Sequence, residues 1–447
     1  MDSMKFQQQL LQAAIDEGLQ DAEVYAEFST AISIEVNNNE LDTYETSEEG
    51  GVSFRARFND KMGYAYTEKI EQDSIQFLVD AVKKNASVIE IEDTTTSFEG
   101  SDYYEKANFH NAKLTAVTPA AMIATLQQIE QQILAIDKRI KRVSHCQMQL
   151  FTGERHLLNA KGLDLHEAGN GLIVYANAVA MANGETKTGS EVAIIDDLAD
   201  FTSDEFAQRV AAQALAGLGG QSIASAKYPI ILENEAATSL LNVFTSCFSA
   251  EEAQKGMSRL QGKVGEQIAT SHLTITDEPR YEKSLSKTTF DAEGVAAMPR
   301  KIIEQGVLQT LLHNRRTAAE EGVATTGNAY KPSYKGTIAI APHKFVVHPG
   351  QTTKEAMIQE LTEGVVITSL AGLHAGANTI SGDFSVAANG FYVKDGKVVG
   401  PTKQMTIASN FFELLKNIEE VANDTYAGFA RVSSPSLRIA PIAVTVE

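Results

Sequence analysis

The sequence predicts a mixed α+β protein in which helices and antiparallel strands are segregated along the chain. Three observations predict this class. Short runs of alternating apolar and polar residues recur between residues 24 and 66, as in half-buried antiparallel strands. Apolar residues at helical spacing precede and follow those runs, at 6–15 and 75–82. An Asp395-Gly396 pair between apolar residues indicates a tight hairpin near the C-terminus.

Residues 1–220 are predicted to form a helix-on-antiparallel-sheet domain. Turn-rich tracts separate its apolar runs: 37–39, 48–51 and 59–61. This arrangement predicts an antiparallel meander with one solvated face. A polar, acidic tract at about 93–113 contains few aliphatic residues and is expected to be a loop.

The remainder of this domain is predicted to be a helix, further strands and a second helix. The first helix is expected to begin at Thr118-Pro119, because threonine caps helices and proline fits the first turn. Strands are expected from 143 to 195. Thr202 and Glu205 have the spacing of a capping box, and the helix that they begin is expected to end near Gly217–Gly220. We therefore predict a domain boundary at residue 220.

Residues 221–447 are predicted to form a second, β-rich domain. It is expected to begin with a helix and to continue as antiparallel hairpins in a barrel-like arrangement with flanking helices. A Glu-Gln-Gly turn within 302–308 predicts one hairpin, and Asp395-Gly396 predicts another. A late helix is expected to begin at Asn410 and to bury a set of apolar residues, namely Phe411, Leu414, Leu415, Ile418 and Val421.

Composition argues against nucleic-acid and membrane binding. The 447 residues carry a formal net charge of −20, which repels phosphate backbones, and Lys138–Arg142 is the main basic cluster in the sequence. No run approaches the ~20 apolar residues of a membrane span, and the N-terminus lacks the pattern of a secretion signal. The two cysteines, Cys146 and Cys247, are expected to be free thiols. We therefore expect a cytoplasmic protein.

Several segments in the second half of the chain follow one another in a distinctive order. They are Gly262–Glu266, Phe290–Val295, Pro299–Leu308, Thr326–Asn328, Ser381–Ser385, Gly390–Val393, Asp395–Lys397 and Asn423–Asp424. In this order they resemble the TldD/PmbA family, bacterial proteins known as modulators of DNA gyrase and understood as a two-subunit metalloprotease system. One subunit type carries an HExxxH zinc helix and the other does not. This sequence contains no HExxxH and so resembles the PmbA (TldE) type.

The resemblance also implies where the zinc helix of the other subunit type would fall. Counting back from Gly262 aligns the two histidine positions with Leu241 and Ser246, and the glutamate position with Asn242. Leucine cannot bind zinc, neutral serine binds it poorly, and an asparagine cannot take a proton from water. The segment 430–436, which matches the family's C-terminal cysteine region, contains serines and no cysteine. We therefore expect no catalytic or metal-binding residue here, and zinc only in a TldD-type partner.

Other polar motifs in the sequence are weaker. His166-Glu167 is followed by glycines that would break a ligand-bearing helix, so a strand end and turn are expected there. His343 and His348 are five residues apart in a predicted extended segment, on opposite faces, and are expected to be ordinary histidines together with His374.

The family resemblance implies a groove where an extended peptide adds to a sheet. Four residues are candidates for contact with such a peptide: Glu266, Gly382, Asp383 and Ser385. For Glu266 a structural role is an equal alternative.

Three functions remain open from the sequence. The first is a non-catalytic subunit that pairs with a TldD-type HExxxH subunit to degrade or process peptides. The second is a homodimeric peptide-binding or scaffold protein without protease activity. The third is a self-contained hydrolase with an unrecognised site. The identity of the peptides and any link to gyrase do not follow from the sequence.

Overall fold

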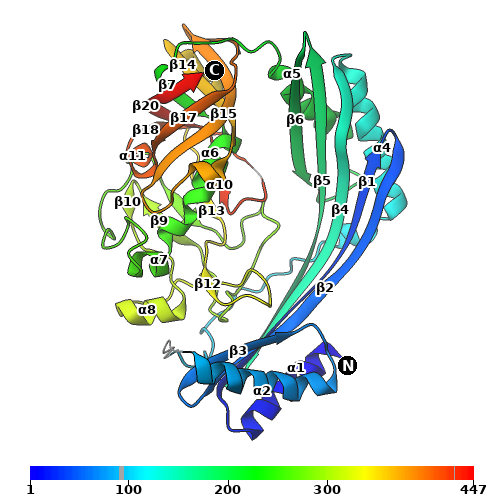
Figure 1. Ribbon diagram of the computed structural model, residues 1–447, viewed down its shortest axis with the longest axis vertical. Coiled ribbons are helices and arrows are strands. Elements are labelled where there is room, and N and C mark those ends of the chain that lie inside the picture. The colour runs from blue at the N-terminus through cyan, green and yellow to red at the C-terminus, as the bar shows by residue number, and fades with distance from the viewer. Residues whose placement is uncertain (90–94, 427, 447) are drawn as a thin grey trace.

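A computed structural model describes residues 1–89, 95–426 and 428–446 of the chain. Its N-terminal part is built on one long antiparallel sheet, which arches beside a compact C-terminal part (Figure 1). The order in this long sheet is β3-β2-β1-β4-β5-β6. Its strands are β1 (Gln20–Asn37), β2 (Glu40–Phe58), β3 (Lys61–Thr67), β4 (Ile140–Asn159), β5 (Asp164–Ala182) and β6 (Glu185–Ile194).

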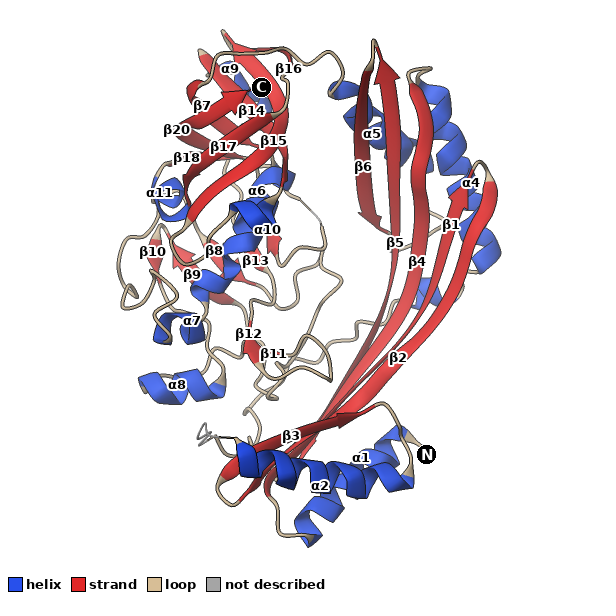
Figure 2. Ribbon diagram, in the orientation of Figure 1, coloured by secondary structure: helices blue, strands red, loops and turns tan. Residues whose placement is uncertain are grey.

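Helices cover the two ends of this sheet (Figure 2). Helices α1 (Ser3–Asp16) and α2 (Gln72–Val88) pack on one end, and α4 (Pro119–Ile136) and α5 (Ser203–Ala216) pack on the other. A short helix α3 (Ala112–Thr115) interrupts the loop expected at 93–113, of which residues 93 and 94 lie outside the described part.

Local capping signals specify the ends of these helices to different degrees. The Thr118 hydroxyl accepts a hydrogen bond from the backbone N–H of Ala121 at 3.2 Å, as predicted. Thr202 makes no such bond to the backbone, and its hydroxyl donates instead to the Glu205 carboxylate at 3.3 Å. The helix start at Thr202 was therefore predicted correctly, but its capping-box hydrogen bond was not.

The turn predicted at 48–51 is wrong, because β2 continues through it. Gly50 and Gly51 pair across the sheet with Phe28 and Glu27. A Cβ atom on Gly50 would lie 2.4 Å from the Phe28 ring, and one on Gly51 would lie 2.4 Å from the ring of Tyr334. These glycines therefore permit close packing within the sheet and do not reverse the chain.

The C-terminal part contains a closed five-stranded barrel, which confirms the predicted barrel-like domain core. Its strands follow the order β14-β7-β20-β17-β15, and β14 also pairs with β15, which closes the ring. Only the β7–β14 pairing in this ring is parallel among the described residues. The bounds are β14 (Glu363–Ala371), β7 (Ala226–Leu232), β20 (Leu437–Val446), β17 (Met405–Asn410) and β15 (Asp383–Lys394), with β16 (Lys397–Pro401) and β18 (Ile418–Val421) attached.

Smaller elements surround the barrel. One sheet has the order β10-β9-β8-β13-β19, and β11 pairs with β12. These strands are β8 (Ile275–Asp277), β9 (Arg300–Glu304), β10 (Val307–Leu308), β11 (Ala329–Tyr330), β12 (Ala339–Ile340), β13 (Phe345–Val347) and β19 (Val432–Ser433). The helices are α6 (Asn234–Val243), the 3-10 turn η1 (Phe244–Phe248), α7 (Ala250–Gln254), α8 (Arg315–Glu321), α9 (Lys354–Gln359), α10 (Leu373–Gly376) and α11 (Phe411–Lys416).

The two hairpins predicted in this part are confirmed as β9–β10 and β15–β16. The C-terminal part begins with strand β7 and not with a helix, because Tyr228, Ile230 and Leu232 alternate into the barrel core. Helix α11 begins after Asn410 as predicted but ends at Lys416, since Ile418 pairs with Ile439 of β20 instead. The predicted division at residue 220 falls in the segment that joins α5 to β7.

None of the helices in the described part of the chain combines the length and the apolar composition needed to cross a bilayer. Both cysteines are buried free thiols, as predicted.

Candidate functional site

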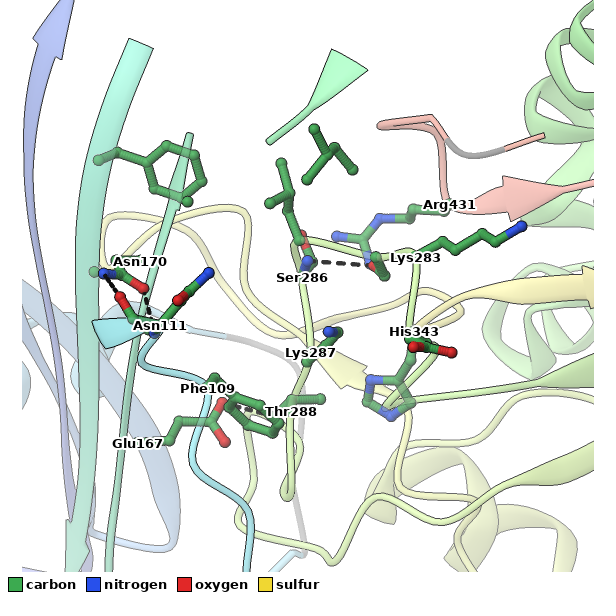
Figure 3. Close-up of a pocket in the computed structure, with 18 of the residues that line it drawn as sticks. Phe109, Asn111, Glu167, Asn170, Lys283, Ser286, Lys287, Thr288, His343 and Arg431 are labelled. Atoms are coloured by element: carbon green, nitrogen blue, oxygen red, sulfur yellow. Dashed lines mark hydrogen bonds between the residues drawn. The ribbon is translucent and has the colours of Figure 1, made fainter. Parts of the chain in front are cut away.

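A cavity of 1480 Å³ lies between the long sheet and the C-terminal part. The sheet contributes residues of β1, β4, β5 and β6 to its lining. Segments 108–111, 282–288 and 329–332 also line it, together with Thr425, Tyr426 and Arg431. Figure 3 shows Lys283, Lys287, His343 and Arg431 on one side of this cavity, across from Asn111 and Asn170. We refer to it as the central cavity.

A row of charged residues crosses the sheet wall of the central cavity. Strand register places Arg155 of β4 directly between Glu27 of β1 and Glu167 of β5. The Arg155 Nε donates to a Glu167 carboxylate oxygen at 2.6 Å. The same guanidinium also donates to Thr288 and to the carbonyl of Phe290, so it joins the sheet to the C-terminal part.

Glu167 is held by several groups besides Arg155. The Thr288 hydroxyl donates to it at 2.7 Å and the Thr289 N–H at 3.0 Å. Glu167 thus lies within β5, and the strand end and turn expected at His166-Glu167 are wrong. The glycines that follow stay in the strand because they leave room for aromatic rings: a Cβ on Gly171 would lie 2.5 Å from the Phe151 ring.

Arg431 and His343 belong to the opposite wall. The Arg431 guanidinium stacks 4.0 Å over the Tyr330 ring and donates through Nη1 to the Pro342 carbonyl at 2.8 Å. His343 donates through Nε2 to the Gly327 carbonyl at 2.7 Å. Burial lowers the pKa of His343, which keeps the imidazole neutral at pH 7.

The two segments that the family resemblance aligns with the zinc helix and the cysteine region are in contact. The backbone N–H of Arg431 donates to Asn242 Oδ1 at 3.0 Å, and that of Ser434 donates to the Thr238 hydroxyl at 3.1 Å. The N–H of Asn234 donates to the Ser436 hydroxyl at 3.1 Å. Side chains in each segment therefore accept hydrogen bonds from backbone N–H groups of the other segment and hold the two segments together.

The residues that the resemblance assigns to the zinc-helix positions do not fit a zinc ion. Leu241 is packed in the barrel core, while Ser246 is exposed on the 3-10 turn that follows α6. The Asn242 oxygen is already an acceptor for Arg431. In the described ranges 1–89, 95–426 and 428–446, no group of three or more His, Cys, Asp or Glu side chains is arranged to hold a metal.

The four predicted groove residues lie outside the lining of the central cavity. Glu266 is exposed and pairs with Lys263 at 2.8 Å, and its carbonyl accepts from the Leu308 N–H at 3.0 Å. Asp383 and Ser385 are exposed on β15, and Gly382 precedes that strand. Their contact with a peptide stays a prediction.

The predicted histidines are also dispersed. His348 is hydrogen-bonded to the Thr276 hydroxyl at 2.7 Å, and His374 lies on α10. Only His343 of the three lines the central cavity.

Sequence reasoning missed several charged residues that line the cavity. Arg155, Lys287 and Arg431 belong to no short motif, and their proximity depends on strand register and on the packing of the two parts. The Phe290–Val295 motif gave an indirect signal. Its Asp291 is 1 % exposed and accepts hydrogen bonds from the N–H groups of Glu293, Val295 and Ala329, so the motif shapes a turn beside the cavity.

An extended sheet beside a closed barrel, with a large cavity between them, defines a two-part α+β protein. The chain belongs to the PmbA/TldD family. Three family models match it: PmbA/TldA metallopeptidase domain 1 at 22–86, the central domain at 112–218 and the C-terminal domain at 225–446.

Individual relatives agree with this assignment. The chain is 26% identical to "Metalloprotease PmbA" of Escherichia coli O157:H7, covering 95% of this chain and 94% of that protein. It is 25% identical to a PmbA homologue of Haemophilus influenzae, covering 94% and 93%. A Thermotoga maritima protein named as a modulator of DNA gyrase has the same fold, with a TM-score of 0.91 and 29% identity over 99% of this chain and 100% of that one. TldE from Thermococcus kodakarensis shares the fold, with a TM-score of 0.89 and 23% identity over 98% and 100%.

Proposed function

We propose that this chain is the non-catalytic subunit of a cytosolic PmbA/TldD-type metalloprotease that degrades or processes peptides. Membership of a family whose relatives are named metalloproteases supports the reaction class. The observation that carries the non-catalytic role is the hydrogen bond from the Arg431 N–H to Asn242 Oδ1. At the position of a general base, this residue has an amide that cannot accept a proton and an oxygen that is already engaged.

The proposed partner is a TldD-type subunit that carries HExxxH and holds the zinc. A relative named as a TldD homologue, from Haemophilus influenzae, is 25% identical over 83% of this chain, so both subunit types share this fold family. The central cavity gives this chain a function in such an assembly. It would form part of the wall around an extended peptide and would exclude folded proteins from the partner's zinc.

The test is reconstitution with the HExxxH family member from the same cell. Neither that partner nor this chain alone is expected to hydrolyse a library of unstructured peptides efficiently, and the mixture is expected to do so. Replacing the partner's HExxxH glutamate by glutamine should abolish hydrolysis, because the general base is lost. Asn242→Ala in this chain should leave hydrolysis nearly unchanged.

Two results would contradict the proposal. If Asn242→Ala abolished turnover while folding and assembly were intact, this chain would have chemistry of its own. If no HExxxH protein associated with it in the native cell and it purified as a homodimer that binds peptides, the scaffold function would replace the proposed one.

A further inference from the structure

Lys287 is a cation without a partner among the described residues, in a protein of net charge −20. It is half-buried in the wall of the central cavity, and no described residue forms a hydrogen bond or an ion pair with its ammonium group. A partly buried charge without a counter-ion is unfavourable, and an anionic ligand would remove that cost.

Arg431 supplies a second donor group on the same wall (Figure 3). Its stack on Tyr330 and its bond to the Pro342 carbonyl fix the guanidinium in one orientation. The other N–H groups of this guanidinium have no hydrogen-bond partner in the described part of the chain. A planar guanidinium held in this way is suited to bidentate binding of a carboxylate.

No described acidic residue forms an ion pair with Lys287 or Arg431. Glu167 is occupied by Arg155, Thr288 and Thr289, and Asp291 by three backbone N–H groups. At another part of the lining Glu233 is paired with Lys354 at 2.7 Å. Glu282, in the same loop as Lys287, is exposed.

On the opposite wall the charges are paired with one another: Glu167 with Arg155, and Glu191 with Arg209 at 3.2 Å. Asn111 and Asn170 satisfy each other through two hydrogen bonds, of 2.7 and 2.9 Å, between the main chain of one and the side chain of the other. Half-buried apolar side chains of the sheet lie in the same lining, namely Phe151, Val192 and Ile194. One wall of the cavity thus offers the cations Lys287 and Arg431, and the other offers paired charges beside apolar surface.

We propose that Lys287 and Arg431 form a carboxylate-binding subsite of the central cavity, which selects peptides that carry an anionic group next to apolar residues. This inference rests on the proposed function only in taking a peptide as the occupant. The carboxylate has two sources, an acidic side chain or the free C-terminus of the peptide.

Fluorescently labelled peptides of one apolar sequence distinguish these sources. One ends in a free carboxylate, one is amidated, and one is amidated with an internal glutamate. Their dissociation constants are measured by fluorescence anisotropy with the full chain alone. They are measured again with the chain mixed with the HExxxH partner whose glutamate is replaced by glutamine. We expect at least one carboxylate-bearing peptide to bind about tenfold more tightly than the neutral amide, as for a charge-assisted pair.

Variants assign that preference to residues. Lys287→Gln should reduce the difference in affinity between carboxylate-bearing and neutral peptides to about twofold. Lys287→Glu should reverse this preference, because the subsite would then repel carboxylate. Arg431→Gln should weaken the same peptides, while Lys397→Gln, at an exposed position on β16, should change nothing. Equal binding of all three peptides in both preparations, or a preference unaltered by Lys287→Glu, would overturn the inference.

The outcome is separable from that of the proposed function. A preference that depends on Lys287, without hydrolysis in the mixture, would support the subsite and refute the subunit role. Hydrolysis at a rate that does not depend on the charge of the peptide would support the subunit role and refute the subsite.

Discussion

Asn242 and Arg431 are joined by a 3.0 Å hydrogen bond in which the main-chain N–H of Arg431 donates to the side-chain oxygen of Asn242. They are 189 residues apart in the sequence. The bond connects the end of α6 to the strand segment that supports one wall of the central cavity. The Asn242 side chain therefore positions the main chain of a segment that is distant in the sequence.

This relationship predicts the effect of removing the amide. Asn242→Ala should lower the free energy of unfolding by about 1–2 kcal/mol, because the Arg431 N–H loses its acceptor in a partly buried place. Ser246→Ala, at an exposed position of the same motif, should change it by less than about 0.5 kcal/mol. Denaturant unfolding of both variants is the measurement. Equal stability of the two variants would show that the hydrogen bond contributes nothing.

A second prediction concerns zinc. The unchanged chain should contain no stoichiometric zinc, and the double variant Leu241→His/Ser246→His should not gain it. Leu241 is 6% exposed in the barrel core and Ser246 is exposed, so the two imidazoles would not reach one ion, and a structural site needs about four ligands. Elemental analysis after dialysis against a chelator tests both proteins. About one retained zinc per chain in either would contradict the prediction.

The sequence predicted elements whose cause is local. Thr118 caps α4 and Asp395-Gly396 turns a hairpin because each acts on its own neighbours, and Asp395 has the positive φ of 50° that such a turn requires. Glycines whose role is long-range packing led to wrong predictions of turns. Gly50, Gly51 and Gly171 lie inside strands because rings from other parts of the chain occupy the space of a Cβ.

The candidate site was the least predictable feature, again for a physical reason. Arg155 meets Thr288 across 133 residues, and Arg431 stacks on Tyr330 of β11. Such contacts depend on strand register and on how the two parts of the chain pack together, and residue spacing in the sequence predicts neither. The assignment of Leu241, Asn242 and Ser246 to the zinc-helix positions rests on the family resemblance and stays a prediction. Of the three, Asn242 contacts the 430–436 segment.

A third prediction tests the structural role of the Ser381–Ser385 motif. Gly382→Ala should destabilise the protein by more than about 2 kcal/mol, because φ is +83° and the added Cβ would lie 2.6 Å from the Phe412 ring. Gly262→Ala has a similar φ of +70° but nothing within 4 Å, so it should cost only about 1 kcal/mol. Thermal unfolding compares the two variants. If they were equally destabilised, backbone strain alone would account for both.

The last prediction concerns the pH dependence of stability, which depends on Lys344. Its side chain is 2% exposed, and its ammonium group donates to the carbonyls of Gly428 at 2.9 Å and Ala430 at 2.6 Å. Burial lowers the pKa of Lys344 from 10.5 to about 8. Between these values the unfolded chain binds more protons at this residue than the folded chain does. The contribution of Lys344 to the free energy of unfolding therefore rises as the pH increases from about 8 to about 10.5, by at most about 3 kcal/mol.

Lys344→Met removes this contribution, so the free energy of unfolding of the variant should rise less, or fall more, over that pH range than that of the unchanged protein. Lys397→Met, at an exposed position, should keep the original pH dependence. Urea unfolding at several pH values between 7.5 and 10.5 gives the slope of the free energy of unfolding against pH for the unchanged protein and for both variants. These pH limits are set by the pKa values of Lys344 in the folded and unfolded states. Parallel slopes for Lys344→Met and the unchanged protein would mean that the buried ammonium keeps its ordinary affinity for a proton. In that case its two carbonyl partners would offset the cost of burial, and the wall segment that contains Arg431 would be held by a cation at every pH in this range.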